Sequence, residues 1–154
     1  MNPLKVPGKK ERAEIEGKLK RQFGVFNLPG EIFMRGKDKM FLFSGSFDFN
    51  KVKELERNVV IERLGVYFAK LDEKTGDLRL SIEGSQILKP NKNVFEINAS
   101  QAEEWMLGRE LGIKTGKKGF LAMKYGNDFL GTGKASDEKI GNFVPKNRRL
   151  KEKS

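Results

Sequence analysis

Two apolar runs near the C-terminal end are separated by a Gly-Asn pair, and this arrangement constrains the fold more than any other feature. The runs are GFLAMKYG, residues 119–126, and DFLGTGKA, residues 128–135. Glycine and asparagine tolerate the positive φ angles that the tightest hairpin turns require. Gly126-Asn127 therefore predicts that these two runs pair as antiparallel strands of one sheet.

The second run continues as DFLGTGKAS, and its Gly-x-Gly-Lys raises the question of a loop that binds nucleotide phosphates. A Walker loop needs Gly-x-x-x-x-Gly-Lys-Ser/Thr, because its backbone wraps the phosphates and its hydroxyl holds magnesium. Asp128 stands where the first glycine belongs, and Ala135 stands where the hydroxyl belongs. The dinucleotide pattern fails too, since Ser136 replaces its third glycine. These glycines need another explanation.

Periodicity predicts helices and strands along the rest of the chain. Ile15, Leu19 and Phe23 recur at helical spacing and predict a helix over residues 9–23. Apolar residues alternate with polar ones over 77–83, which predicts a half-buried strand. Further strands are expected on both sides of a turn at 35–39 and at 65–71, 94–97 and 142–150. A short helix is expected at 51–59, and a short turn or helix around 85–88. One more helix should follow the capping pattern Ser100-x-x-Glu103, with Ala102, Trp105 and Met106 facing inward.

The glycine content agrees with strongly curved strands. The chain has 17 glycines in 154 residues, which exceeds the usual share of roughly 7%. Short strands at close spacing, with a few helices beside them, favour a small barrel-like sheet over an alternating parallel one. The predicted fold class is α+β.

The net charge of +10 is concentrated at the two ends of the chain. Residues 1–21 hold seven Lys or Arg and three Glu, and residues 114–154 hold eleven basic and four acidic residues. Residues 22–113 hold thirteen basic and fourteen acidic residues. Such a distribution attracts polyanions, with nucleic acid first and an anionic membrane surface second. A solubilising surface with lysine-rich ends is the alternative explanation.

The sequence contains no cysteine and no histidine, which excludes several kinds of chemistry. Disulfides, thiolate nucleophiles, the usual zinc sites and histidine acid–base catalysis all need one of these residues. No apolar run approaches the roughly 20 residues that span a bilayer, and the N-terminus lacks an apolar signal core. We expect a monomeric, cytoplasmic protein with no metal, no cofactor and no membrane partner.

Four segments of the C-terminal half occur in the order and spacing of one RNA-binding family. Residues 63–65, RLG, enter an apolar strand, and residues 85–88 read SQIL. Residues 130–134, LGTGK, and 141–149, GNFVPKNRR, then give an apolar-Gly-x-Gly-Lys segment followed by Asn-x-x-Pro-Lys-x-x-Arg. This pattern resembles the PUA-like RNA-binding domain of the Nop/Sun (RsmF-type) ribosomal-RNA cytosine methyltransferases. Gln86 and Gly141 depart from the histidine and lysine that are common there.

The resemblance implies a PUA-like mixed β pseudo-barrel with flanking helices over residues 60–150. Residues 1–59 would form an N-terminal basic helix and hairpin extension, and residues 151–154 a disordered tail. The related methyltransferases use cysteine thiolates and a separate cofactor-binding domain, so we expect no enzyme here. The resemblance implies a non-catalytic protein that binds structured RNA, ribosomal or transfer RNA, in rRNA maturation or RNA modification.

A second interpretation is a protein-interaction subunit that docks on a separate RNA-modification enzyme or a ribosomal protein. Such an enzyme could also be a partner in trans of an RNA-binding protein. An exposed apolar patch on residues 30–59 would favour the interaction subunit, whereas a continuous basic groove would favour RNA.

The predicted RNA site lies on the C-terminal strands. Pro145 cannot donate to a sheet ladder, so its segment should be an edge strand or a strand end. Alternation would then turn Lys146 and Arg148 to one side, toward a ligand. Glycines within a strand either let RNA approach the backbone or let the strand bend. The predicted RNA-binding residues are Lys117, Lys118, Lys124, Tyr125, Gly131, Gly133, Lys134, Asn142, Lys146, Arg148 and Arg149.

Overall fold

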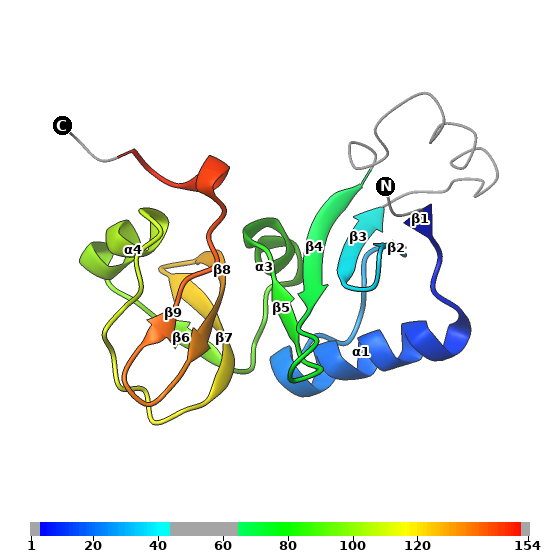
Figure 1. Ribbon diagram of the computed structural model, residues 1–154, viewed down its shortest axis with the longest axis horizontal. Helices are drawn as coiled ribbons and strands as arrows, with labels where there is room; N and C mark the ends of the chain where they lie inside the picture. Colours follow the sequence, from blue (N-terminus) through cyan, green and yellow to red (C-terminus); the bar gives the residue numbers. More distant parts are fainter. Residues whose placement is uncertain (1–3, 44–64, 152–154) are drawn as a thin grey trace.

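The computed structural model describes residues 4–43 and 65–151, which form two sheets with a short helix between them (Figure 1). The first sheet has the order β1-β2-β3-β4-β5, and each neighbouring pair is antiparallel. Its strands are β1 (Leu4–Lys5), β2 (Glu31–Arg35), β3 (Lys39–Phe43), β4 (Val66–Leu71) and β5 (Leu78–Leu80). The hairpin expected around residues 35–39 is β2–β3. The helix expected at 51–59 lies outside the described residues.

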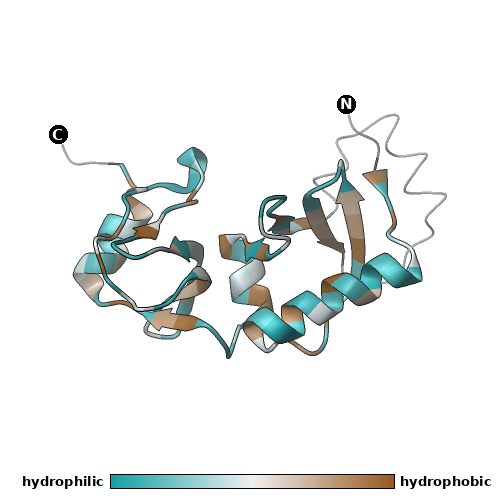
Figure 2. Cartoon of the chain, turned by 60° about the horizontal axis from the view of Figure 1, so that its bottom comes forward, coloured by the Kyte–Doolittle hydropathy of each residue, from teal (hydrophilic) through white to brown (hydrophobic). Residues whose placement is uncertain are grey.

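Helix α1 (Lys9–Phe23) packs on one face of the first sheet, as its apolar spacing predicts. Ile15, Leu19 and Phe23 are buried, while the side that faces the viewer in Figure 2 is mostly hydrophilic. Gly24 ends the helix in the left-handed region at φ 67°, where its N–H donates to the Lys20 carbonyl over 3.0 Å. The side-chain amide of Gln22 pairs with both backbone groups of Leu78, which satisfies the outer edge of β5.

The second sheet has the order β6-β7-β8-β9 and is mixed, because β6 runs parallel to β7. Its strands are β6 (Val94–Glu96), β7 (Gly119–Tyr125), β8 (Asp128–Ala135) and β9 (Ile140–Gly141). The predicted hairpin is confirmed, since Tyr125 pairs with Asp128 across the two-residue turn. Helix α4 (Ala99–Met106) covers this sheet with buried Ala102 and Trp105, whereas Met106 is only partly buried.

Strand β7 joins the two halves of the molecule because both of its faces are buried. Phe120 and Ala122 belong to the core that α1 and the first sheet form. Leu121 and Met123 point the other way, into the core beneath Trp105. Successive side chains of a strand point to opposite faces, so one strand contributes to both cores. The result is a mixed α+β fold, the class that the sequence predicts.

The strand predicted over residues 77–83 is wrong at its C-terminal end, where helix α3 (Ile82–Leu88) begins. Strand β5 ends at Leu80, and Ser81 caps the helix by accepting the N–H of Gly84 over 2.9 Å. Apolar alternation extends through Ile82, yet this residue is buried as the first residue of a helix. The Ser81 N-cap ends the strand, and the alternating pattern alone does not distinguish a strand residue from the first residue of a helix.

Two further local predictions are wrong. The capping box of α4 uses Asn98 and Gln101 rather than Ser100 and Glu103. The helix therefore begins two residues earlier than the sequence pattern predicts. The final strand expected at 142–150 does not form: the sheet ends with β9 at Gly141, and residues 142–150 contain a 3₁₀ helix (Lys146–Arg148) instead. The Asn142 side chain favours this end of the strand, because its amide donates to the Trp105 carbonyl and its oxygen accepts the Val144 N–H, which a further strand would need for the sheet ladder.

The first sheet takes strands from both sides of the boundary proposed between residues 59 and 60. Strands β2 and β3 precede that boundary, and β4 and β5 follow it. The boundary stays a prediction, as does the tail at 151–154, of which residues 152–154 lie outside the described part. In the ranges 4–43 and 65–151, no helix has the length and apolar character needed to cross a membrane.

Candidate nucleic-acid interface

Three hollows adjoin one another at Phe143, which lines all of them. Two of the hollows are lined from both sheets, and the third lies beside β8 and β9 of the second sheet. The middle hollow, of about 310 Å³, shares Arg79 with one neighbour and Lys134 with the other. We call this combined surface the intersheet groove. The middle hollow is lined by Lys70, Asp72, Lys74, Arg79, Phe120, Lys134 and Phe143. Four cations and two aromatic rings thus surround one carboxylate, which makes the hollow electropositive.

Arg79 and Lys70 come from paired strands of the first sheet. They are opposite each other in the β4–β5 register, so their side chains leave the same face. Leu78 and Leu80 point to the opposite face and are buried in the core. The alternation that predicted β5 therefore also fixes the direction of Arg79. Its guanidinium carbon lies 4.1 Å from the centre of the Phe143 ring, which is cation–π distance.

Phe143 is held at the surface by its two neighbours in the chain. The Asn142 amide donates to the carbonyls of Trp105 and Arg109 over 2.8 and 2.9 Å, and its oxygen accepts the Val144 N–H over 2.7 Å. Val144 is buried in the second core. With both neighbours fixed inward, the Phe143 side chain stays 37% exposed, which leaves part of its ring open to a ligand.

Lys134 reaches the groove from the second sheet. It pairs with Phe120 across β7 and β8, and its ammonium lies 5.9 Å from the centre of the Phe120 ring. Among the residues that the structure describes, no carboxylate forms an ion pair with Lys74, Arg79 or Lys134. These three cations are available to neutralise phosphates.

Two ionisable groups at the groove keep fixed charge states near neutral pH. Burial raises the pKa of the Tyr67 hydroxyl above its ordinary 10.0, and the neighbouring Arg79 opposes this shift only in part. Tyr67 therefore stays protonated and able to donate. The hydrogen bond from Thr75, over 2.7 Å, lowers the pKa of Asp72, and the charge of Lys134 acts in the same direction. Asp72 remains ionised and offsets part of the positive charge.

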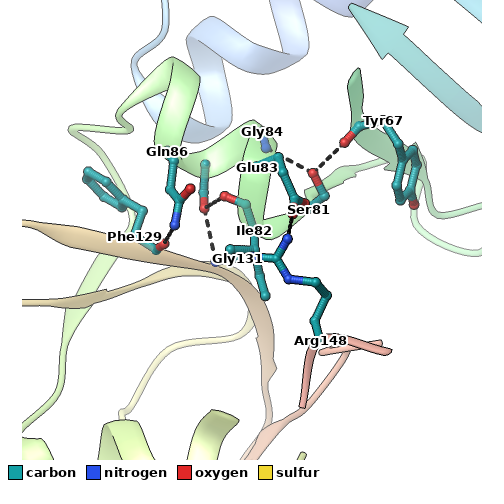
Figure 3. Close-up of polar contacts among 10 residues, drawn as sticks. Tyr67, Ser81, Ile82, Glu83, Gly84, Gln86, Phe129, Gly131 and Arg148 are labelled. Carbon is teal, nitrogen blue, oxygen red and sulfur yellow. Dashed lines mark hydrogen bonds and ion pairs between the residues drawn. The ribbon is translucent and has the colours of Figure 1, made fainter. Parts of the chain in front are cut away.

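The structure explains the glycines of DFLGTGKAS by packing. Gly131 has φ 79° and lines the groove, and its N–H donates to the Ser85 hydroxyl over 2.9 Å (Figure 3). A Cβ on Gly133 would come within 2.5 Å of Ile140 and 2.6 Å of Trp105. Gly133 thus allows the tryptophan ring to lie against the strand. A ligand contact by either backbone stays a prediction.

Helix α3 fastens the two sheets together beside the groove (Figure 3). The Gln86 amide donates to the Phe129 carbonyl over 3.2 Å, at the position where the resembled family commonly has histidine. Ser85 bonds to Gly131 on the same strand, and Glu83 forms an ion pair with Arg148. These contacts run from α3 to β8 and to the C-terminal segment, so α3 holds in place two elements that line the groove.

The predicted RNA-binding residues separate into groups in the structure. Lys134, Gly131 and Asn142 line the groove. Lys124 and Tyr125 lie at the opposite end of the β7–β8 hairpin from Lys134. Exposed positions in the loop before β7 hold the remaining lysine pair, Lys117 and Lys118.

The basic residues after Pro145 do not alternate as on a strand. Arg148 pairs with Glu83, and the Arg149 guanidinium donates to the Val144 carbonyl over 2.9 Å while it packs against Gly108. Lys146 is exposed at the start of the 3₁₀ helix. Both arginines therefore contribute to the fold of this segment, and an RNA contact by them stays a prediction.

Sequence reasoning missed Lys70, Lys74, Arg79 and Phe143. Arg79 carries a readable signal, since it lies between two leucines of an alternating strand and must face outward. Lys74 lies in the polar turn after β4, where a solvated lysine is the ordinary expectation. Phe143 was one of twelve phenylalanines, and only its fixed neighbours show that it stays at the surface.

Comparisons with known proteins agree with this architecture. Residues 92–150 match the family described as the methyltransferase RsmF PUA domain. Similar curated proteins are the ribosomal RNA small subunit methyltransferases F of Vibrio vulnificus strain YJ016, Vibrio parahaemolyticus and Shewanella oneidensis, which are 26, 27 and 28% identical. Each alignment covers 94% of this chain but only 29 or 30% of the relative. The chain thus spans about three-tenths of the length of these relatives.

A solved structure shows the same fold over nearly the whole chain. A conserved PUA domain protein from Thermoplasma acidophilum has a TM-score of 0.58 and 13% identity, covering 92% of this chain and 93% of its own. The family match begins at β6 and includes the second sheet, α4 and the C-terminal segment. Residues 92–150 of this chain therefore resemble the methyltransferase RsmF PUA domain, and the whole chain has the fold of a PUA domain protein.

Proposed function

We propose that this protein binds structured RNA, ribosomal or transfer, through the intersheet groove, without catalysing a reaction itself. The observation that carries the proposal is the middle hollow, where Lys74, Arg79 and Lys134 converge from two sheets beside an exposed Phe143. Cations position the phosphate backbone, and aromatic rings or guanidinium planes stack on unpaired bases. The related proteins are named as ribosomal RNA methyltransferases, which supports a role in rRNA maturation or RNA modification.

The groove favours RNA over the interaction-subunit alternative. That alternative needs an exposed apolar patch on residues 30–59, and the part of this range that the structure describes is residues 30–43. Large hydrophobic side chains there are buried or partly buried rather than exposed. An RNA-modification enzyme that acts in trans remains compatible with an RNA-binding groove, and we include it in the proposal as a second partner.

Binding should weaken strongly as salt is added. Several neutralised phosphates release counterions, so affinity is expected to fall about tenfold or more between roughly 50 and 200 mM salt. Titrating a labelled structured RNA with the purified protein at both concentrations measures this. Equal affinities at the two salts, or no binding at the lower one, would contradict the RNA proposal.

We also expect no methyl transfer by this chain alone. The resembled methyltransferases attack cytosine with a cysteine thiolate, and the 154 residues include no cysteine. Incubating the purified protein with ribosomal RNA and labelled S-adenosylmethionine should leave the RNA unlabelled. An established rRNA methyltransferase in a parallel reaction confirms that the RNA is a competent substrate. Label above background in the absence of that enzyme would refute the non-catalytic assignment.

A further inference from the structure

The Phe143 ring is partly exposed, so a nucleobase could stack on it. Its neighbours Asn142 and Val144 are fixed inward, yet 37% of its own surface remains exposed. One contact is with the Arg79 guanidinium at 4.1 Å, and another is with the Phe120 ring, whose centre lies 6.0 Å away at a tilt of 55°. A guanidinium that lies over an aromatic ring covers one face of the ring and offers its own outer plane to a nucleobase.

The ring lies where cations could hold the phosphates of the same nucleotide. Lys74 and Lys134 line the middle hollow together with Phe143, and both lysines are exposed. They come from the turn after β4 and from β8, so they flank the ring from the two sheets. The hollow measures about 310 Å³ and is open to solvent, which leaves room for a base beside the ring.

The shape of the groove discriminates between paired and unpaired RNA. A double helix offers phosphates and 2′-hydroxyls on a convex surface, while its bases are stacked inside. Phe143 lines all three hollows, and a base that stays stacked inside a duplex has no free face to place on its ring. An unpaired nucleotide can turn its base into the groove while its phosphates stay near the lysines.

We propose that the intersheet groove binds an unpaired nucleotide, whose base stacks on the Phe143–Arg79 pair while Lys74 and Lys134 neutralise its phosphates. The inference rests on the proposed RNA-binding function and names the RNA element that the groove recognises. A flanking duplex would contact the exposed basic surface around the groove, and the unpaired nucleotide would supply the added affinity.

Three labelled RNAs test the inference with the intact chain. They are a blunt duplex, the same duplex with a short single-stranded overhang, and that overhang with abasic sites in place of its bases. The abasic overhang keeps the phosphates and removes only the stacking groups. Base stacking should make the intact overhang bind at least about fivefold more tightly than the abasic one at equal salt.

Two variants test whether the preference for the intact overhang over the abasic one depends on the Phe143 ring. Phe143→Leu keeps apolar volume against Phe120 and should abolish the preference, whereas Phe143→Tyr keeps a stacking surface and should retain it. Melting temperatures of both variants show whether the fold is intact. The comparison of intact and abasic overhangs in the unaltered protein stands even if a variant fails to fold.

The outcomes separate this inference from the proposed function. If the unaltered protein binds the blunt, intact and abasic RNAs equally, RNA binding stands and the unpaired-nucleotide site is refuted. A preference for bases that Phe143→Leu retains would refute the assignment to this ring. If none of the three RNAs binds at low salt, the proposed function itself fails, and the inference fails with it.

Discussion

Replacing Lys74 and Lys134 together with glutamate is expected to weaken RNA binding at least about 100-fold while the protein stays folded. Hydrogen bonds to charged groups contribute roughly 1.5–3 kcal/mol each, and two such contacts would be lost. Both lysines are exposed, and exposed substitutions of this kind usually change stability by about 0.5 kcal/mol or less. The slope of affinity against salt should also fall by about two, one for each phosphate contact.

A matched control is Lys9→Glu with Lys10→Glu, which makes the same change in formal charge. These exposed lysines lie in the first turn of α1, where acidic residues suit the helix dipole. This control should lose only the small affinity that the overall charge supplies. RNA titration and thermal melting of both double variants provide the comparison. Equal losses would show that net charge alone determines binding, and a larger loss in the control would move the site to α1.

The second large effect is expected on stability, from Gly84→Ala in α3. A Cβ at this position would overlap the Phe68 carbonyl oxygen and lie 2.8 Å from its carbon and 2.9 Å from its Cα. The backbone of β4, an interior strand of the first sheet, cannot move aside as a side chain can, so we expect a cost of about 3 kcal/mol. For a chain of this size, the melting temperature should fall by about 6–12 °C.

Gly17→Ala is the matched control for that substitution. A Cβ at Gly17 meets nothing within 4 Å, and the residue lies inside helix α1. Alanine there should raise stability by about 0.5–1 kcal/mol, because glycine is a poor helix former. Thermal melting of both variants tests the contrast. If Gly84→Ala melts at the temperature of the unaltered protein, α3 does not pack on β4 as closely as described.

The groove depends on the same packing. Helix α3 lies on β4 through Gly84 and holds β8 through Ser85 and Gln86. A shift of α3 would therefore displace Gly131 and the strand that carries Lys134. We expect Gly84→Ala to lose RNA affinity together with stability, whereas the paired lysine variant loses affinity alone. The contrast distinguishes damage to the fold from removal of a contact.

Elements with strong local signals could be predicted from sequence. The stripe of Ile15, Leu19 and Phe23 predicted α1, and Gly126-Asn127 predicted the β7–β8 hairpin, because helical spacing and tight turns are properties of neighbouring residues. Local signals failed where two of them competed. Ile82 continued an alternating pattern, but the Ser81 cap made it the start of a helix.

The sequence by itself determined the fold class, both hairpins and the outward direction of Arg79, since each depends on residues a few positions apart. Only the tertiary structure decided the candidate site. Arg79, Lys134 and Phe143 are far apart in the chain and meet because β7 is buried on both faces and draws the two sheets together. The tertiary structure also pairs Arg148 with Glu83 and leaves Phe143 at the surface. Such long-range contacts follow from the packing of whole elements, which local periodicity does not encode.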